Sequence, residues 1–78
     1  MSELTLFYRP TCPYCMKVFS FMNRAGIKLE SRNVSADPEA LTELVERGGM
    51  DQVPCLKIGE RYLYESDDII AYLDANAR

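Results

Sequence analysis

Residues 4–15 read LTLFYRPTCPYC, in which a run of strand-forming residues leads directly into two cysteines. The first five residues are the apolar, β-branched and aromatic types that favour a strand, and Pro10 cannot continue it. From Pro13 onward, apolar residues recur at the spacing of a helix until Gly26, a residue suited to a helix end. The pattern therefore places Cys12 and Cys15 where a strand ends and a helix begins.

The middle of the chain continues this alternation. Residues 28–33 favour a second strand, and Asp37 followed by Pro38 is typical of a helix start. The apolar face of this helix is expected to consist of Leu41, Leu44 and Val45. The glycine pair at 48 and 49 then predicts the end of the helix.

The last third of the chain favours a hairpin and a helix. Residues 55–58 and 61–64 are predicted strands joined by a two-residue turn, Gly59-Glu60. Ser66 is expected to cap a final helix, with acidic residues in its first turn. The buried face of this helix is expected to consist of Ile69, Ile70 and Leu73.

The predicted order of elements is thus β-α-β-α-β-β-α. A strand–helix–strand unit joins its strands in parallel through a right-handed crossover, and the hairpin adds antiparallel strands to the same sheet. We therefore predict an α/β fold with a mixed four-stranded sheet and three helices. A chain of 78 residues rarely holds two hydrophobic cores, so residues 1–78 are expected to form a single domain.

Composition and charge exclude several classes of function. Apolar residues make up 47% of the chain and charged residues 27%, as in an ordinary globular domain. Twelve acidic and nine basic residues give a net charge of −3 without a run of like charges, so we expect no nucleic-acid or membrane partner. No apolar stretch approaches the roughly 20 residues that span a bilayer.

The chain contains no histidine, which removes imidazole nucleophile pairs, imidazole acid–base catalysis and imidazole zinc ligands. Three cysteines are an odd number, which argues against a secreted disulfide framework. Residues 1–4, MSEL, carry neither a basic region nor a long apolar segment, so we expect no signal peptide. The expected location is the reducing cytoplasm.

Cys12 and Cys15 are the candidate redox pair. At the start of a helix, free backbone N–H groups and the positive end of the helix dipole favour a thiolate at Cys12, and Arg9 adds a nearby cation. Cys15 lies one turn further on, within reach of a disulfide and in a less exposed place. The alternative, a structural zinc site, normally needs four ligands, which three cysteines without histidine do not supply, so we expect no metal.

The motif RPTCPYC at residues 9–15 resembles the active-site motif of dithiol glutaredoxins, in the thioredoxin-fold superfamily. The element order also matches that family, and Gln52-Val53-Pro54 resembles the Val-Pro loop that faces its cysteines. The resemblance implies a thioredoxin/glutaredoxin fold, catalytic Cys12 and Cys15, and glutathione as cosubstrate. Cys55 is left over, and a free cysteine in an apolar strand usually acts as a small buried hydrophobe.

The resemblance also implies where the glycyl half of glutathione binds. Arg9 and Gln52 would hold its carboxylate, although an exposed loop glutamine often has no specific role. If the bond before Pro54 is cis, as the family implies, Val53 presents its backbone to an extended peptide; a proline at the start of a strand is the plainer interpretation. Tyr14 would line the thiol site.

The stretch YESDDI at residues 64–69 departs from most glutaredoxins, which carry a Gly-Gly pair before the last helix. It resembles the Glu-Ser signature of the N-terminal domain of glutathione transferases. By this resemblance, Ser66 and the helix N–H groups would hold the γ-glutamyl carboxylate, and Asp67 or Glu65 would hold the ammonium. Alternatively, Ser66 is only a cap, and the two acidic side chains are solvated.

The leading hypothesis is a glutathione-dependent thiol–disulfide oxidoreductase, expected to be a monomer. Its partners would be glutathione and proteins that carry disulfides or mixed disulfides with glutathione. Three alternatives remain: an electron donor reduced by thioredoxin reductase, a glutathione-binding module of transferase type, and an iron–sulfur carrier. In the family, the last activity goes mainly with glycine after the first cysteine, where this chain has Pro13.

Overall fold

The computed structural model describes residues 4–77. Met1–Glu3, on which the expectation of no signal peptide largely depends, lie outside the described residues. The elements, in chain order, are β1 (Leu4–Tyr8), α1 (Pro13–Ala25), β2 (Glu30–Asn33), α2 (Pro38–Glu43), a π-helical turn η1 (Leu44–Gly48), β3 (Cys55–Ile58), β4 (Arg61–Tyr64) and α3 (Ser66–Asn76). No helix among the described residues has both the length and the apolar character to cross a bilayer.

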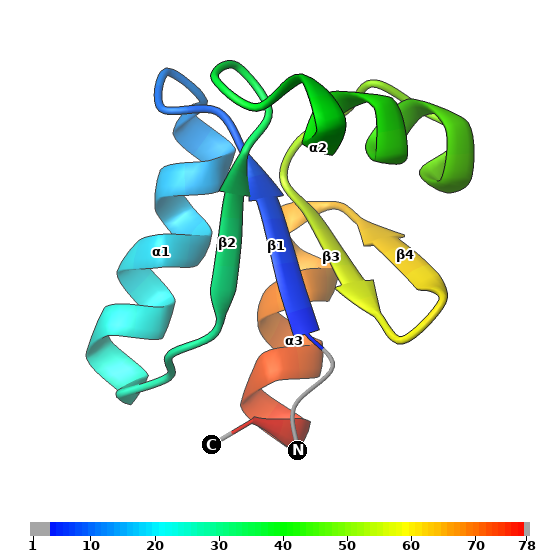
Figure 1. The fold of residues 1–78 in the computed structure, drawn as a ribbon. Coiled ribbons are helices and arrows are strands. Elements are labelled where there is room, and N and C mark those ends of the chain that lie inside the picture. The colour runs from blue at the N-terminus through cyan, green and yellow to red at the C-terminus, as the bar shows by residue number, and fades with distance from the viewer. Residues whose placement is uncertain (1–3, 78) are drawn as a thin grey trace.

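The four strands form one mixed sheet in the order β2-β1-β3-β4, which confirms the predicted α/β fold. β1 pairs in parallel with β2, and the β1–β3 and β3–β4 pairs are antiparallel. Helices α1 and α3 lie side by side on one face of the sheet, and α2 lies on the other (Figure 1). The sheet is therefore covered on both faces, as its apolar central strands require.

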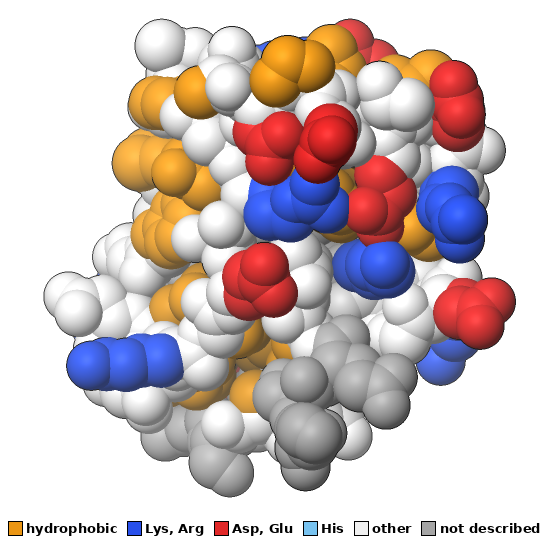
Figure 2. Space-filling view, in the orientation of Figure 1, with side chains coloured by type: hydrophobic (Ala, Val, Ile, Leu, Met, Phe, Trp, Pro, Cys, Tyr) orange, Lys and Arg blue, Asp and Glu red, His pale blue; other side chains and the backbone are white. Residues whose placement is uncertain are grey.

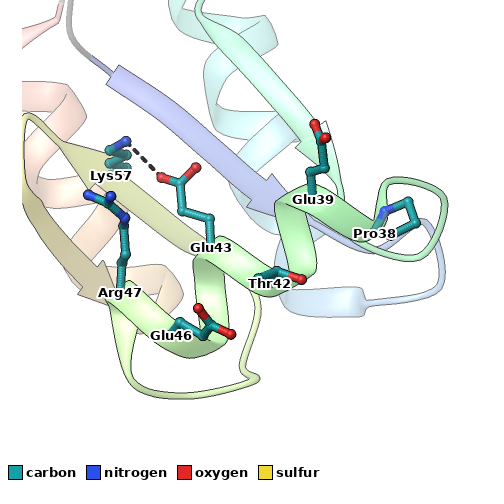
Figure 3. Close-up of a pocket in the computed structure, with 7 residues that line it drawn as sticks. All are labelled: Pro38, Glu39, Thr42, Glu43, Glu46, Arg47 and Lys57. Atoms are coloured by element: carbon teal, nitrogen blue, oxygen red, sulfur yellow. Dashed lines mark hydrogen bonds and ion pairs between the residues drawn. The ribbon is translucent and has the colours of Figure 1, made fainter.

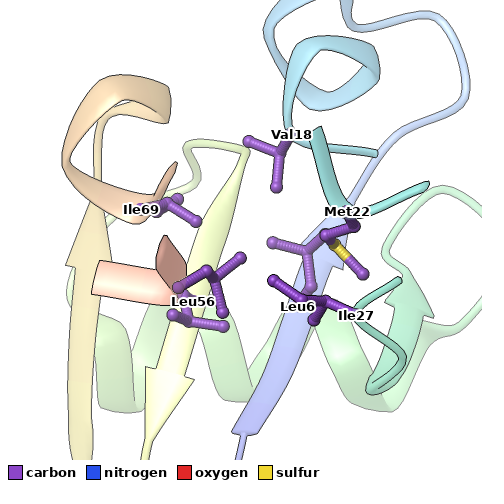
Figure 4. Close-up of a cluster of buried hydrophobic side chains, with 7 residues drawn as sticks. Leu6, Val18, Met22, Ile27, Leu56 and Ile69 are labelled. Carbon is purple, nitrogen blue, oxygen red and sulfur yellow. The ribbon is translucent and has the colours of Figure 1, made fainter. Parts of the chain in front are cut away.

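Alternation along the two central strands builds two separate cores. Leu6 and Leu56 are register partners that point to α1 and α3, where they join a cluster with Val18, Met22, Ile27, Ile69 and Leu73 (Figure 4). The next register pair, Phe7 and Cys55, points to α2. All four of these strand residues have no exposed surface. The period of two in a strand thus divides the apolar residues between both layers.

The structure corrects three of the sequence-based expectations. β2 begins at Glu30 rather than at residue 28, because its pairing with β1 starts only at the Thr5–Glu30 partners. The second helix changes into the π-helical turn η1, whose wider turn shifts the angular positions of its residues. Val45 is consequently 42% exposed, whereas Leu44 is buried in the core.

Glu43 on α2 is the centre of a charged network above the sheet. Its carboxylate accepts hydrogen bonds from Arg32 Nη1 at 2.8 Å, Lys57 Nζ at 2.7 Å and Tyr62 Oη at 2.9 Å. Acidic and basic side chains alternate over this face of the molecule (Figure 2). The bond from Lys57, helped by those from Tyr62 and Arg32, lowers the pKa of Glu43 to about 2 against the opposing effect of burial.

We expect this network to make the fold sensitive to acid. The pKa of Glu43 is lowered from 4.5 to about 2 by folding, so its stabilisation is complete above about pH 4.5 and is lost as the pH falls toward 2. The loss should be about 1–2 kcal/mol, because solvent reaches the network and screens it. Urea unfolding of the wild type and Glu43→Gln between pH 7 and pH 3 measures it.

The variant should be less stable than the wild type at neutral pH and should lose less stability on acidification. Glu39→Gln, a substitution of an exposed glutamate on the same helix, is the matched control and should behave as the wild type. Parallel pH profiles for the wild type and Glu43→Gln would show that this carboxylate is not the titrating group.

Candidate functional site

Cys12 is the N-cap residue of α1, as its position in the sequence predicts. Its extended backbone places Sγ over the first turn of the helix, where it accepts the backbone N–H of Cys15 at 3.2 Å. Pro13 occupies the first turn, where its missing N–H costs no hydrogen bond. The Cys12 sulfur therefore accepts a backbone N–H bond and lies at the positive end of the helix dipole.

Cys15 has a different environment although it is only one turn away. Its side chain has no exposed surface, whereas Cys12 is partly exposed. Burial is the main reason why the pKa of Cys15 is raised to about 12, and the neighbouring Cys12 raises it further. The two thiols are thus differentiated: Cys12 is accessible at the helix terminus, and Cys15 is held as a protonated thiol behind it.

The loop before β3 faces the cysteines. The Val53–Pro54 peptide bond is cis, which confirms the implication of the family resemblance for this bond. The Cys12 thiol donates to the Val53 carbonyl oxygen across a distance of 3.7 Å. Residues 41 positions apart in the sequence therefore form one wall of the site.

A cleft of about 450 Å³ adjoins this wall. Seven of the eight residues predicted to bind glutathione line it, and they are Tyr14, Gln52, Val53, Pro54, Glu65, Ser66 and Asp67. Arg9 is absent from its lining, and Lys17 is an additional member that the sequence reasoning missed. Tyr14 and Lys17 are three residues apart on one helix and therefore lie on the same face, so the predicted role of Tyr14 could have indicated that Lys17 also lines the cleft. The fold therefore brings α1, the cis-proline loop and the start of α3 together.

Two ion pairs flank the cysteines. Lys17 Nζ lies 2.6 Å from Asp67 Oδ1, so this pair joins α1 to α3 at the cleft. Arg9 Nη2 lies 2.7 Å from Asp51 Oδ1. Arg9, which was predicted to bind the glycyl carboxylate of glutathione, is thus paired with the carboxylate of the residue before Gln52. Asp51 is a second residue that the sequence reasoning missed, and no local pattern marks it.

Ser66 is not the helix cap that the sequence predicted. The N-cap residue of α3 is Glu65, which makes no side-chain capping hydrogen bond, and Ser66 is the first helical residue. Glu65 adopts φ 76° and ψ 119°, a conformation that disfavours residues other than glycine. Ser66 is only 8% exposed yet lines the cleft, so its hydroxyl is available there without a capping role.

Cys55 lies outside the cleft, in the core beneath α2. It has no exposed surface, and burial raises its pKa to about 11, against a lowering effect from Tyr64. A second hollow of about 440 Å³ lies on the same side, between α2, η1 and Lys57 (Figure 3). Its lining includes none of the predicted site residues. Among residues 4–77, no group of three or more histidine, cysteine or acidic side chains could hold a metal ion.

The chain resembles known proteins in sequence and in fold. The family model described as Glutaredoxin matches residues 4–63. A glutaredoxin of Neisseria meningitidis is 33% identical over 64 residues, which cover 81% of this chain and 75% of that protein. The solution structure of a glutaredoxin from Brucella melitensis is 32% identical, with a TM-score of 0.69, over 97% of this chain and 83% of that one.

A glutathione S-transferase also resembles the chain in fold and sequence. The crystal structure of this enzyme from Methylobacillus flagellatus, with glutathione bound, is 28% identical with a TM-score of 0.78. The match covers 96% of this chain but only 37% of the transferase, so the likeness is to one part of that enzyme. The family match over residues 4–63, the relatives and the paired cysteines at the helix start together place this chain in the glutaredoxin family, whose general activity is thiol–disulfide oxidoreduction.

Proposed function

We propose that this protein is a glutathione-dependent thiol–disulfide oxidoreductase that reduces mixed disulfides of glutathione and protein disulfides through Cys12 and Cys15. The observation that carries the proposal is the cleft, in which seven of the residues proposed to bind glutathione lie together, one of them being Val53, whose carbonyl oxygen contacts the Cys12 thiol. The resemblance to a transferase crystallised with glutathione supports the choice of this tripeptide. The predicted roles of Arg9, Tyr14, Gln52, Val53, Glu65 and Asp67 remain proposals.

The reaction begins at Cys12. Its thiolate attacks the glutathione sulfur of a mixed disulfide, so that a Cys12–glutathione bond forms and the substrate leaves as a thiolate that takes a proton from water. A second glutathione thiolate then attacks the glutathione sulfur bound to Cys12. This step forms oxidised glutathione and restores the Cys12 thiolate, and each exchange makes one S–S bond and breaks one.

A protein disulfide requires Cys15. After Cys12 has formed a mixed disulfide with the protein, the Cys15 thiolate attacks Cys12 Sγ and releases the protein thiol. In the dithiol state, burial and the Cys12 sulfur both raise the pKa of Cys15. Once Cys12 is bonded to another sulfur, it no longer carries a charge or the thiol proton. The Cys12 contribution then disappears, which lowers the pKa of Cys15 when that thiol is needed.

The test is reduction of a small glutathione mixed disulfide, coupled to NADPH oxidation by glutathione reductase. We expect turnover that depends on both glutathione and this protein. A parallel reaction replaces glutathione and its reductase by thioredoxin reductase. Activity with thioredoxin reductase alone would replace the proposal by the second redox hypothesis. Glutathione binding without reduction by either donor would favour the transferase-type module.

Ser66→Ala should separate a ligand contact from a structural role. Ser66 is the first residue of α3 rather than its cap, so the loss of its hydroxyl should change the free energy of unfolding by less than about 0.5 kcal/mol. If the hydroxyl holds the γ-glutamyl carboxylate, the KM for glutathione should rise about fivefold with little change in kcat, because that group is remote from the reacting sulfur. Urea unfolding and steady-state kinetics measure both quantities. A lower stability with unchanged kinetics would contradict this role.

The cytoplasm remains the proposed location, because reduced glutathione is the required donor and reducing compartments maintain it. We also propose that the protein acts as a monomer, since glutathione and one chain supply every group that the reaction uses. Sedimentation of the reduced protein at working concentration tests the second statement.

A further inference from the structure

We propose that Asp51 is a specificity residue that competes with the glycyl carboxylate of glutathione for Arg9. The proposal rests on the proposed function, in which Arg9 is the candidate holder of that carboxylate. Because Asp51 occupies Arg9, the protein gains little from a charge at the C-terminal end of its thiol ligand. The ligand class that it accepts is therefore γ-glutamylcysteinyl thiols whose C-terminal end is either charged or neutral.

The ion pair joins the two segments that meet at Cys12. Arg9 Nη2 lies 2.7 Å from Asp51 Oδ1, and the Arg9 carbonyl oxygen accepts the Cys12 N–H at 3.2 Å. Asp51 precedes by two residues Val53, whose carbonyl oxygen lies 3.7 Å from the Cys12 sulfur. The Arg9 and Asp51 side chains are 29% and 52% exposed, so a solute beside Cys12 can reach the pair. Gln52, the other predicted holder of the glycyl carboxylate, lines the cleft, whereas Arg9 does not.

The charges of this pair determine what Arg9 offers to a second carboxylate. An arginine without a counterion presents a full positive charge, whereas Arg9 and Asp51 together are neutral. A ligand carboxylate beside the pair is attracted by the guanidinium and repelled by the Asp51 carboxylate, and at similar distances the two Coulomb energies largely cancel. Displacement of Asp51 by the ligand gains little either, because it exchanges one arginine–carboxylate contact for another of the same kind. Arg9 therefore adds little to the binding of a carboxylate while Asp51 is present.

Two competing interpretations predict different effects of the Asp51 charge. If Asp51 orients Arg9 toward the glycyl carboxylate, loss of its charge should weaken the binding of glutathione. If the pair only links the loop before β3 to the segment before α1, as many exposed ion pairs do, its loss should affect every thiol equally. Asp51→Asn separates these cases, because asparagine keeps an oxygen that can accept the hydrogen bond from Arg9 but removes the negative charge.

The experiment measures the equilibrium for mixed-disulfide formation at Cys12 in a Cys15→Ser background, where the adduct is not resolved internally. The probes are oxidised glutathione and the oxidised ethyl ester of its glycyl carboxylate, which differ in that charge. In both cases the Cys12 thiolate and the symmetrical disulfide yield the adduct and one free thiolate. Mass spectrometry gives the adduct fractions. The ratio of the two equilibrium constants is compared between variants, so that intrinsic differences between the two disulfides cancel.

Three variants and one control are compared with the parent. Asp51→Asn removes the competing charge, Asp51→Glu retains it, and the double variant Asp51→Asn with Arg9→Gln removes both charges. Glu39→Gln, a substitution of an exposed residue on α2 that does not line the cleft, is the matched control for the loss of one negative charge. Urea unfolding shows whether each variant is folded.

The parent should form the two adducts equally well, within about twofold. Asp51→Asn should raise the ratio in favour of glutathione about three- to fivefold, since Arg9 then meets the glycyl carboxylate with its full charge. This gain should be absent from the double variant, from Asp51→Glu and from Glu39→Gln. It should also shrink at high salt, as expected of an interaction between exposed charges.

A lower ratio in Asp51→Asn would show that Asp51 orients Arg9, and an unchanged ratio would show that the pair only links the two segments. Either result would overturn the proposal for Asp51 while leaving the glutathione reaction intact, because the parent would still form its adduct. Failure of the parent protein to form any glutathione adduct would instead overturn the proposed function.

Discussion

Cys12→Ser should lower the rates of two reactions, the reduction of glutathione mixed disulfides and the reduction of protein disulfides, by at least about a thousandfold. The reason is that a serine hydroxyl at the helix start is not a competent nucleophile at neutral pH. Cys15→Ser should keep the reduction of glutathione mixed disulfides within about threefold of the wild type, since the second thiol then comes from glutathione in solution. The same variant should lose at least about tenfold in the reduction of a protein disulfide, because no internal thiol remains to release the substrate. Coupled assays with both substrates measure the two rates.

Cys55→Ala is the matched control for these variants. It removes the third thiol from the core beneath α2, outside the cleft, and should leave both rates unchanged. If Cys15→Ser lost the reduction of glutathione mixed disulfides, Cys15 would act in every turnover. Loss of either reaction in the folded Cys55→Ala protein would give Cys55 a role that its burial does not suggest.

The fold could be predicted from the sequence because local signals and tertiary contacts agree along most of the chain. Asp37 accepts the N–H groups of Glu39 and Ala40, as expected of a cap. Gly26 has φ 71°, as expected of a glycine that ends a helix. Where the prediction failed, the reason is tertiary. Pairing with β1 determines where β2 begins, and the π-helical turn determines which apolar residues of the second helix are buried.

The site was only partly predictable, because motifs mark residues that act on the substrate but not the residues that hold them. Cys12, Cys15 and the Val53-Pro54 loop belong to patterns that are recognisable in one dimension. The partners of Arg9 and Lys17 are Asp51 and Asp67, which lie 42 and 50 residues away in the sequence. Contacts at such separations form only when the fold brings the segment around the cysteines next to the loop before β3 and the start of α3, so no spacing rule reveals them.

Ser66 illustrates the same limit at a single residue. A serine before acidic residues and an apolar face is a typical cap signal, and that signal was wrong here by one position. The chain reverses between β4 and α3 at Glu65, which has a positive φ and is the N-cap, so the helix starts one residue earlier than the capping pattern predicts. The consequence for function is favourable, since a hydroxyl that caps no helix is available to a ligand.

Alkylation of the reduced protein should label one cysteine per chain, and that cysteine should be Cys12. The pKa of Cys15 is raised to about 12 and that of Cys55 to about 11, so near pH 7 their thiolate fractions are about 10⁻⁵ and about 10⁻⁴. Both are also without exposed surface, whereas Cys12 is partly exposed at the helix terminus. Brief treatment with iodoacetamide at mildly acidic pH, followed by peptide mapping, should therefore find the label at Cys12 in a large excess over the other two.

The same treatment in denaturant provides the control, because unfolding removes the burial that separates the three thiols and all of them should then react. A second arm starts from protein whose Cys12 is already in a mixed disulfide with a small thiol. In that mixed disulfide Cys12 no longer raises the pKa of Cys15. Cys15 should therefore attack Cys12 and release the small thiol at a lower pH than its pKa of about 12 in the dithiol protein would allow. If Cys15 or Cys55 were labelled before Cys12 in the folded protein, Cys12 would not be the nucleophile. The position of Cys12 at the helix terminus and the burial of Cys15 would then not explain which thiol attacks the substrate.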